Sequence, residues 1–244
     1  MCKGPNSRWS VDGHDKLATY GFQIYGIIDC YSRRILGMFC GLSNRTPIAV
    51  QKFYLKTVKR YGFPKLVRSN KGIETLLMAV VQYAFRKQGE PDIGPRKAFA
   101  YGTSTKNQRI EKFWKTLLQG KLAQWREYFE GLHDRDLFDG SKYDIIALQY
   151  LYMEVIRGHL DSFIRVYNSH RIRSQKSREF YLPCGKSNEI YFFPKEGARN
   201  YAKHPDPELM RSFEAQVAWY DDGKYLHNKT RQICDNLITQ SGIT

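Results

Sequence analysis

The order of strand-like and helix-like segments constrains the fold of this chain more than any other feature. Two apolar, strand-favouring segments, residues 22–28 and 35–41, are separated by the polar turn 29–34. A shorter alternating segment, residues 9–12, precedes them and ends in the carboxylate of Asp12. Because short strands joined by a tight turn pair as antiparallel neighbours, this pattern predicts a three-stranded meander at the start of the chain.

Helices and strands then alternate. A threonine followed by proline at residues 46–47 predicts a helix start, and glycine and proline at 62–64 predict its end. Short strands are predicted at 65–68 and 97–101, on either side of a helix from 76 to about 87. The apolar residues expected to face the core from that helix are Leu77, Val80, Val81 and Ala84. Strands separated by helices pair in parallel, so we expect an α/β fold with a mixed five-stranded sheet flanked by helices.

The second half of the chain has a mostly helical pattern. A long helix is predicted over residues 143–167, and weaker helical signals occur at 207–220 and 225–238. The aromatic segment 191–194 is expected to pack back on the domain as an apolar plug. We therefore divide the chain into a polar lead-in or truncated end (1–8), a core (9–133), a helical extension with a basic loop packed on that core (134–200) and a weakly helical tail (201–244).

Composition narrows the class of partner. The net charge is +15 and 42% of the residues are hydrophobic, so a folded chain that binds a polyanion is expected, with nucleic acid favoured over an acidic membrane surface. We find no apolar run long enough to span a bilayer and no signal-peptide pattern, which predicts a soluble intracellular protein. The five cysteines are scattered and form no Cys-x-x-Cys pair, so neither a disulfide framework nor a zinc site is expected.

A helix predicted from Thr105 carries one acid among several bases. Thr105 and Gln108 have the spacing of a capping box, and the apolar stripe that follows is Ile110, Phe113, Trp114, Leu117, Leu118 and Leu122. Glu111 lies beside that stripe, surrounded by Lys106, Arg109, Lys112 and Lys115. A solvated helix face with local ion pairs is one interpretation, and a carboxylate approached by DNA is the other.

Three side chains that are distant in the sequence are expected at one edge of the sheet. Asp12 ends the first strand, Asn70 follows the fourth, and Glu111 lies on the later helix. Carboxylate oxygens bind hard divalent cations such as Mg²⁺. Two such ions can activate a water or a 3′ hydroxyl and stabilise the leaving oxygen at phosphorus, a chemistry that suits a basic protein acting on phosphodiesters.

Five segments in the same order and spacing resemble the integrase catalytic core of the retroviral integrase and DDE transposase superfamily, especially the integrase-core proteins of eukaryotic transposable elements. They are residues 4–13, 28–33, 68–74, 101–114 and 167–173. The resemblance implies a ribonuclease H-like fold, with Asp12 and Glu111 as the first and third members of a metal-binding acidic triad. It places Asp29 in a turn motif outside that triad. It also implies Mg²⁺ or Mn²⁺ as cofactor, two ions in the active form, and a nuclear location.

Position 70 departs from this family pattern, which has Asp where this chain has Asn70. An amide keeps an acceptor oxygen but loses the negative charge, so weak metal occupancy and little strand transfer are expected. The substitution could be engineered, or natural in a domesticated copy that binds without cutting. A neighbouring acid such as Glu74 could also replace the missing carboxylate, an option that we disfavour because Glu74 lies a turn further along.

These observations predict an integrase or transposase core that processes 3′ ends and joins element DNA to target DNA, impaired at position 70. A catalytically inactive DNA-binding or assembly protein and a structure-selective nuclease are the alternatives. The expected DNA contacts are Lys106, Asn107, Arg109, Lys112, Lys115, Arg171, Arg173 and Lys176, although Asn107 could serve only the helix cap and the last three could be a solvated loop. A homo-oligomer is expected because two DNA ends are handled together, and no small-molecule substrate is expected.

Overall fold

The computed structural model describes residues 2–103, 107–173 and 183–242. A central sheet contains β1 (Trp9–His14), β2 (Gln23–Asp29), β3 (Ile35–Gly41), β4 (Val67–Asn70) and β5 (Phe99–Gly102). The strand order is β3-β2-β1-β4-β5. The pairs β1–β2 and β2–β3 are antiparallel, whereas β1–β4 and β4–β5 are parallel, as expected from the sequence.

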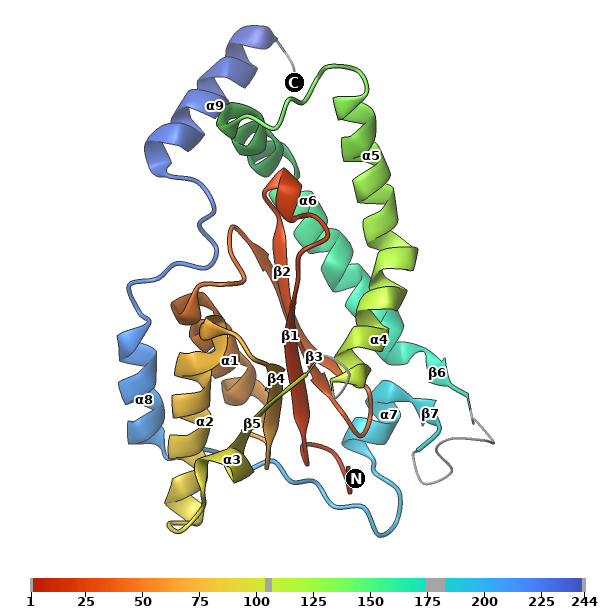
Figure 1. The fold of residues 1–244 in the computed structure, drawn as a ribbon, viewed down its shortest axis with the longest axis vertical. Coiled ribbons are helices and arrows are strands. Elements are labelled where there is room, and N and C mark those ends of the chain that lie inside the picture. The colour runs from red at the N-terminus through yellow and green to blue at the C-terminus, as the bar shows by residue number, and fades with distance from the viewer. Residues whose placement is uncertain (1, 104–106, 174–182, 243–244) are drawn as a thin grey trace.

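One face of the sheet packs against α1 (Pro47–Tyr61) and α2 (Leu76–Gly89), and α8 (Pro207–Gln216) packs on the outer side of these helices, as Figure 1 shows. Trp9 and Val11 of β1 are fully buried in this layer. A short helix, α3 (Pro95–Ala98), leads from α2 into β5. The tail of the chain therefore contributes to this core through α8, whose Met210 and Phe213 are buried in the same cluster.

The opposite face is covered by a helical layer that runs from α4 (Gln108–Leu117) through a π-helical turn (Leu118–Leu122) into α5 (Ala123–His133). The long helix α6 (Lys142–Ser169) packs beside them. Apolar residues of these helices and of β2 form a second buried cluster. Smaller elements complete the described chain: the 3₁₀ turns Ala18–Tyr20 and Ile73–Thr75, β6 (Arg171–Ile172), β7 (Gly185–Lys186), α7 (Ser187–Phe192) and α9 (Asn228–Ser241).

The predicted inward face of α2 is confirmed for Val81 and Ala84, which pack in the first core, and is wrong for Leu77 and Val80. Leu77 and Val80 are 37% and 59% exposed, whereas Met78, Val81 and Phe85 are buried. The latter residues recur at the spacing of a buried helical stripe. Because several apolar residues occur in succession from Leu76, the sequence allowed more than one such stripe, and packing against α1 selects the stripe centred on Val81.

Two other local expectations are corrected. Helix α4 begins at Gln108, later than predicted, with Asn107 as its N-cap residue and no side-chain capping hydrogen bond. The predicted capping box includes Thr105, which lies outside the described residues. In the predicted aromatic plug, only Tyr191 is buried, since Phe192 and Phe193 are 54% and 80% exposed. These two residues lie at the end of α7, where the chain leaves the core.

The turn between β2 and β3 is built around the fully buried Asp29. Its carboxylate accepts hydrogen bonds from the backbone N–H groups of Asn6 and Ser32 and from the Ser32 hydroxyl. Arg33 has a left-handed backbone (φ 61°) within this turn. Asp29 therefore has a structural role, in agreement with its placement outside the triad. Among the described residues, no helix has the length and apolar content needed to cross a lipid bilayer.

Candidate active site and basic pocket

Strand alternation turns Asp12 away from the α1–α2 layer and toward α4. Trp9 and Val11 face the first core, so Ser10 and Asp12 point to the other side of the sheet. The parallel register pairs Trp9 of β1 with Val67 of β4. The same 58-residue offset brings Asp12 level with Asn70, the last residue of β4.

Both carboxylate oxygens of Asp12 accept hydrogen bonds. Asn70 donates from Nδ2 to Oδ1 at 3.1 Å, and Trp114 donates from Nε1 to Oδ2 at 3.1 Å. The Trp114 ring stacks on His14 with centroids 4.9 Å apart, which fixes the orientation of the indole. Thus β1, β4 and α4 each supply one member of a single hydrogen-bonded group.

Glu111 lies on α4, three residues before Trp114, and is half-buried. Burial and then the nearby charge of Glu111 raise the pKa of Asp12 to about 7, while the hydrogen bond from Trp114 opposes this rise. The structure therefore brings Asp12, Asn70 and Glu111 to one region of the sheet. Two carboxylates that repel in this way would be stabilised by a cation between them.

The oxygen ligands fit a hard cation, although they carry less negative charge than three carboxylates would. Oδ1 of Asn70 is buried and has no hydrogen-bond partner, which leaves a carbonyl-type oxygen available beside the two carboxylates. Oxygen atoms of this kind are the ligands that Mg²⁺ and Mn²⁺ take. Among the described residues, no group of three or more His, Cys, Asp or Glu side chains could hold a metal.

Glu74 is closer to the site than its position in the sequence suggested. It follows β4 on a 3₁₀ turn and its carboxylate folds back over Gly72, where an added Cβ would lie 2.1 Å from Oε2. Its charge makes a smaller contribution to the raised pKa of Asp12 and also raises the pKa of the buried Tyr25. The turn brings the Glu74 charge back toward the end of β1.

Asn107 is only 1% exposed and donates from Nδ2 to the backbone oxygen of Val11 at 3.2 Å. This contact joins the start of α4 to β1 beside Asp12. The arrangement fits the alternative of a local structural role better than contact with DNA. Lys112 and Lys115 of the same helix are exposed, whereas Lys106 lies outside the described residues.

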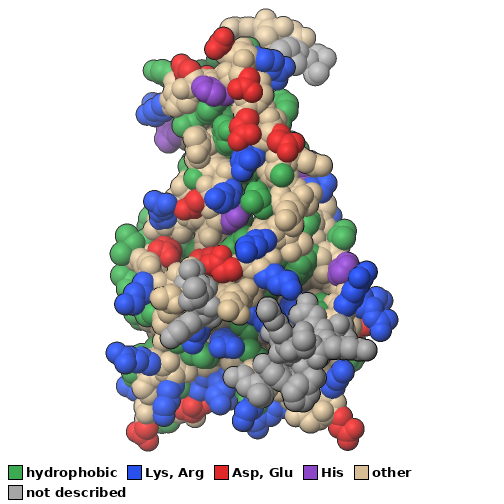
Figure 2. All heavy atoms as spheres, turned by 45° about the vertical axis from the view of Figure 1, so that its right-hand side comes forward, with side chains coloured by type: hydrophobic (Ala, Val, Ile, Leu, Met, Phe, Trp, Pro, Cys, Tyr) green, Lys and Arg blue, Asp and Glu red, His purple; other side chains and the backbone are tan. Residues whose placement is uncertain are grey.

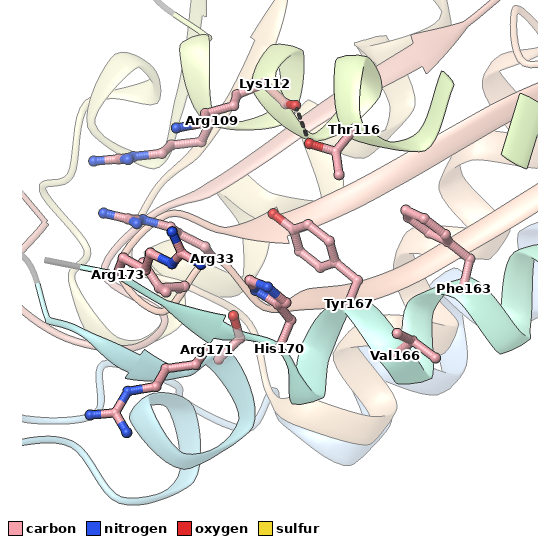
Figure 3. Close-up of a pocket in the computed structure, with 12 residues that line it drawn as sticks. Arg33, Arg109, Lys112, Thr116, Phe163, Val166, Tyr167, His170, Arg171 and Arg173 are labelled. Atoms are coloured by element: carbon pink, nitrogen blue, oxygen red, sulfur yellow. Dashed lines mark hydrogen bonds between the residues drawn. The ribbon is translucent and has the colours of Figure 1, made fainter. Parts of the chain in front are cut away.

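A basic pocket of about 430 Å³ lies on the adjacent side of α4. Of the expected DNA contacts, it collects Arg109 and Lys112 from α4 and Arg171 and Arg173 from the segment after α6. Figure 3 shows Arg33, Arg109 and Arg173 on the same side of Tyr167, with Phe163 further along α6. Lys176 lies outside the described residues.

The expected DNA contacts did not include Arg33 and His170, which also line this pocket. Arg33 reaches it from the β2–β3 turn, and its charge, like that of Arg109, opposes the burial that raises the pKa of Tyr167. The Arg33-Arg34 pair after a turn-forming Ser was a signal in the sequence, but nothing local linked it to α6. Figure 2 shows Lys and Arg side chains spread over this side of the molecule, with a small group of acidic side chains among them.

A mixed sheet of order 3-2-1-4-5 with helices on both faces, and with acidic side chains meeting at β1 and α4, defines a ribonuclease H-like integrase core. The family model for an integrase core domain matches residues 1–182, about three quarters of the sequence. The chain therefore belongs to the integrase core domain family.

Comparison with curated proteins finds no match. Among solved structures, the chain is similar to a chain of the simian T-cell lymphotropic virus intasome in complex with the PP2A regulatory subunit B56 gamma, determined by cryo-electron microscopy. The TM-score is 0.46 and the sequence identity 10%, over 84% of this chain and 60% of that chain. This protein thus spans about 60% of the length of the matched chain.

Proposed function

We propose that this protein is the catalytic core of a DNA integrase or transposase, and that it acts as an oligomer on element ends and target DNA in the nucleus. The observation that carries the proposal is the hydrogen bond from Asn70 to Asp12, formed beside Glu111 in a chain of the integrase core family. The surrounding positive charge, including the exposed Lys112 and Lys115, suits the approach of a phosphate backbone.

Asp12, Glu111 and Oδ1 of Asn70 are the groups that would hold Mg²⁺ or Mn²⁺. A bound divalent pair would supply the activation of a water or 3′ hydroxyl and the stabilisation of the leaving oxygen. Trp114 orients the Asp12 carboxylate through its indole N–H. Lys112 and Lys115 would hold the phosphodiester near Glu111 on the same helix.

Asn70 makes this centre a weak one. Two carboxylates offer one negative charge fewer than the family's three, and Nδ2 of Asn70 already occupies an oxygen of Asp12 that a cation would need. The cation must therefore displace a donor and bind a less charged site. We expect low occupancy and little strand transfer in the protein as it stands.

The experiment compares Asn70→Asp with the unaltered protein in an end-joining assay with Mg²⁺ or Mn²⁺, and measures divalent-ion binding by calorimetry. The variant should bind the cation at least tenfold more tightly, because a charged ligand replaces an amide. It should also join ends that the unaltered protein joins poorly. The double variant Asn70→Asp/Glu111→Gln is the matched control and should lose both gains. The enzyme proposal is overturned if Asn70→Asp gains neither cation binding nor end joining.

A second candidate is a DNA-binding or assembly protein without catalysis. It is favoured by one observation: both oxygens of Asp12 accept hydrogen bonds from protein donors, Asn70 and Trp114. In that case DNA affinity should be the same in chelator and in Mg²⁺, and Asn70→Asp should change neither DNA binding nor end joining. A rise in affinity with Mg²⁺ would count against this candidate.

A further inference from the structure

The basic pocket beside α4 has two chemically different parts. Its cationic part comes from three separate places in the chain: Arg33 on the β2–β3 turn, Lys112 on α4 and Arg173 after β6. No acidic side chain lines it among the described residues. Positive groups gathered from distant segments favour an anionic ligand, and guanidinium groups match phosphate oxygens in both charge and geometry.

The other part is apolar and aromatic. Phe163, Val166 and Tyr167 of α6 line it, and Figure 3 shows these side chains on the helix that faces α4. The Tyr167 ring is held in place by an edge contact with Phe113, with centroids 4.9 Å apart. Val166 is 70% exposed although it lines the pocket. A duplex turns its phosphates and sugars outward and keeps its bases stacked, so a paired backbone alone would leave this apolar wall unused.

We propose that this pocket binds an unpaired nucleotide of a DNA strand, with the phosphate on the arginines and the base against the wall formed by Tyr167 and Val166. The proposal rests on the proposed function for its choice of DNA as the polymer. The pocket chemistry itself calls for a ligand that joins an anion to a flat apolar group. A nucleotide in a single strand has both parts, and aromatic side chains bind unpaired bases without sequence preference.

The position of the pocket relates it to the candidate active site. Lys112 follows Glu111 directly and so lies about 100° further round α4. Arg109 and Thr116 lie on the same side of the helix as Lys112. A strand that crosses the exposed side of α4 therefore passes from Glu111 to the pocket within the width of one helix. The unpaired nucleotide would be held close to the phosphodiester at Glu111.

The test measures binding by fluorescence anisotropy, in chelator so that no reaction occurs. The probes are a blunt duplex, the same duplex with a short single-stranded overhang, and the same overhang made abasic. The base-bearing overhang should bind about tenfold more tightly than the abasic one. Val166→Glu should abolish this difference while leaving blunt-duplex affinity within about twofold of Val155→Glu. Val155 is the matched control, because it is also an exposed valine on α6 but lies about three turns away.

Equal affinity for the base-bearing and abasic overhangs would overturn the pocket proposal. So would an equal loss of overhang binding in the Val166 and Val155 variants, or displacement of the overhang by an acidic aromatic peptide at lower concentration than by a single-stranded oligonucleotide. Each of these outcomes leaves the proposed function intact, provided that the protein still binds the blunt duplex. Failure to bind any of the three DNA probes would instead count against the proposed function itself.

Discussion

At the scale of single residues, the carboxylate of Asp12 is subject to opposing effects on its ionisation. It is a largely buried carboxylate that receives two hydrogen bonds and yet has a pKa raised to about 7, because burial and the charge of Glu111 outweigh the donors. Asn70 reduces the conflict, since a carboxylate in its place would add a second like charge within hydrogen-bond distance of Asp12. The amide therefore lowers the charge repulsion in the metal-free site, and under the proposed function it would also weaken the binding of a metal.

This balance predicts a pH-dependent stability of the metal-free protein. An acid whose pKa is higher in the folded than in the unfolded chain binds more protons when folded, so its contribution to stability falls as pH rises from about 4 to about 7. Asp12→Asn removes that loss. The variant should gain stability relative to the unaltered protein between pH 5 and pH 8, by about 2–4 kcal/mol.

Urea unfolding in chelator at the two pH values measures this gain. Asp161→Asn, at an exposed position on α6, corrects for the general effect of removing one negative charge. The interpretation of Asp12 fails if the variant is equally destabilised at both pH values, since that result would mean that the carboxylate is needed for its hydrogen bonds alone.

At the scale of the elements, the contact between β2 and α4 determines where Glu111 lies. Gly26 pairs with Asp12 across β1 and β2, and the Trp114 ring lies directly over it. A Cβ at position 26 would lie 2.8 Å from Cη2 of Trp114. Because real Cβ contacts are not this short, the glycine is required for α4 to approach the sheet closely enough to place Trp114 on Asp12.

Gly26→Ala should therefore displace the Trp114 ring and α4 with it. We expect a loss of about 1–3 kcal/mol in the free energy of unfolding, as for other overpacked cores. A change in tryptophan fluorescence should accompany it, because the indole loses its place between His14 and Asp12. Gly131→Ala is the control: it lies in α5 with no atom within 4 Å of its added Cβ, and should be neutral or stabilising. An unchanged stability in Gly26→Ala would contradict this view of the packing.

The sequence predicted the elements better than their faces. Strand β3 has the predicted bounds, 35–41, because its continuous apolar run begins directly after the polar turn 29–34 and ends at Gly41. Helix α2 was placed correctly, but only half of its predicted inward face is buried, because a run of apolar residues at its start allows more than one stripe and packing against α1 selects one of them. The start of α4 was missed because Asn107 is held by the Val11 carbonyl of β1, a contact between residues far apart in the sequence.

The same reasoning explains what could be predicted of the candidate site. Asp12, Asn70 and Glu111 belong to recognisable sequence motifs and could be named in advance. Arg33 could not, and Glu74 was only a disfavoured option, because each depends on a turn that folds back: the left-handed residue of the β2–β3 turn in one case and the 3₁₀ turn after β4 in the other. Local pattern rules carry no information about which distant helix such a turn will meet.

At the scale of the whole molecule, the effect of the net charge of +15 on DNA binding depends on where the positive side chains lie on the surface. Positive side chains also occur on the helices of the opposite layer, such as Lys87 of α2 and Arg211 of α8, both of which are exposed. Long-range attraction to DNA would draw on all of these charges, whereas counterion release counts only those that contact phosphates. Salt dependence therefore separates the bound face from the rest of the surface.

Lys112→Ala/Lys115→Ala should lower DNA affinity and make it less sensitive to salt. Each phosphate contact contributes about 0.9 to the slope of log affinity against log salt concentration, so removing two contacts should reduce that slope by about 1.8. Lys87→Ala/Arg211→Ala removes the same charge from the opposite layer and should leave the slope unchanged. The measurement is a salt titration of blunt-duplex binding in chelator. If both double variants reduce the slope equally, DNA does not run along α4, and Glu111 loses the approach on which its proposed role depends.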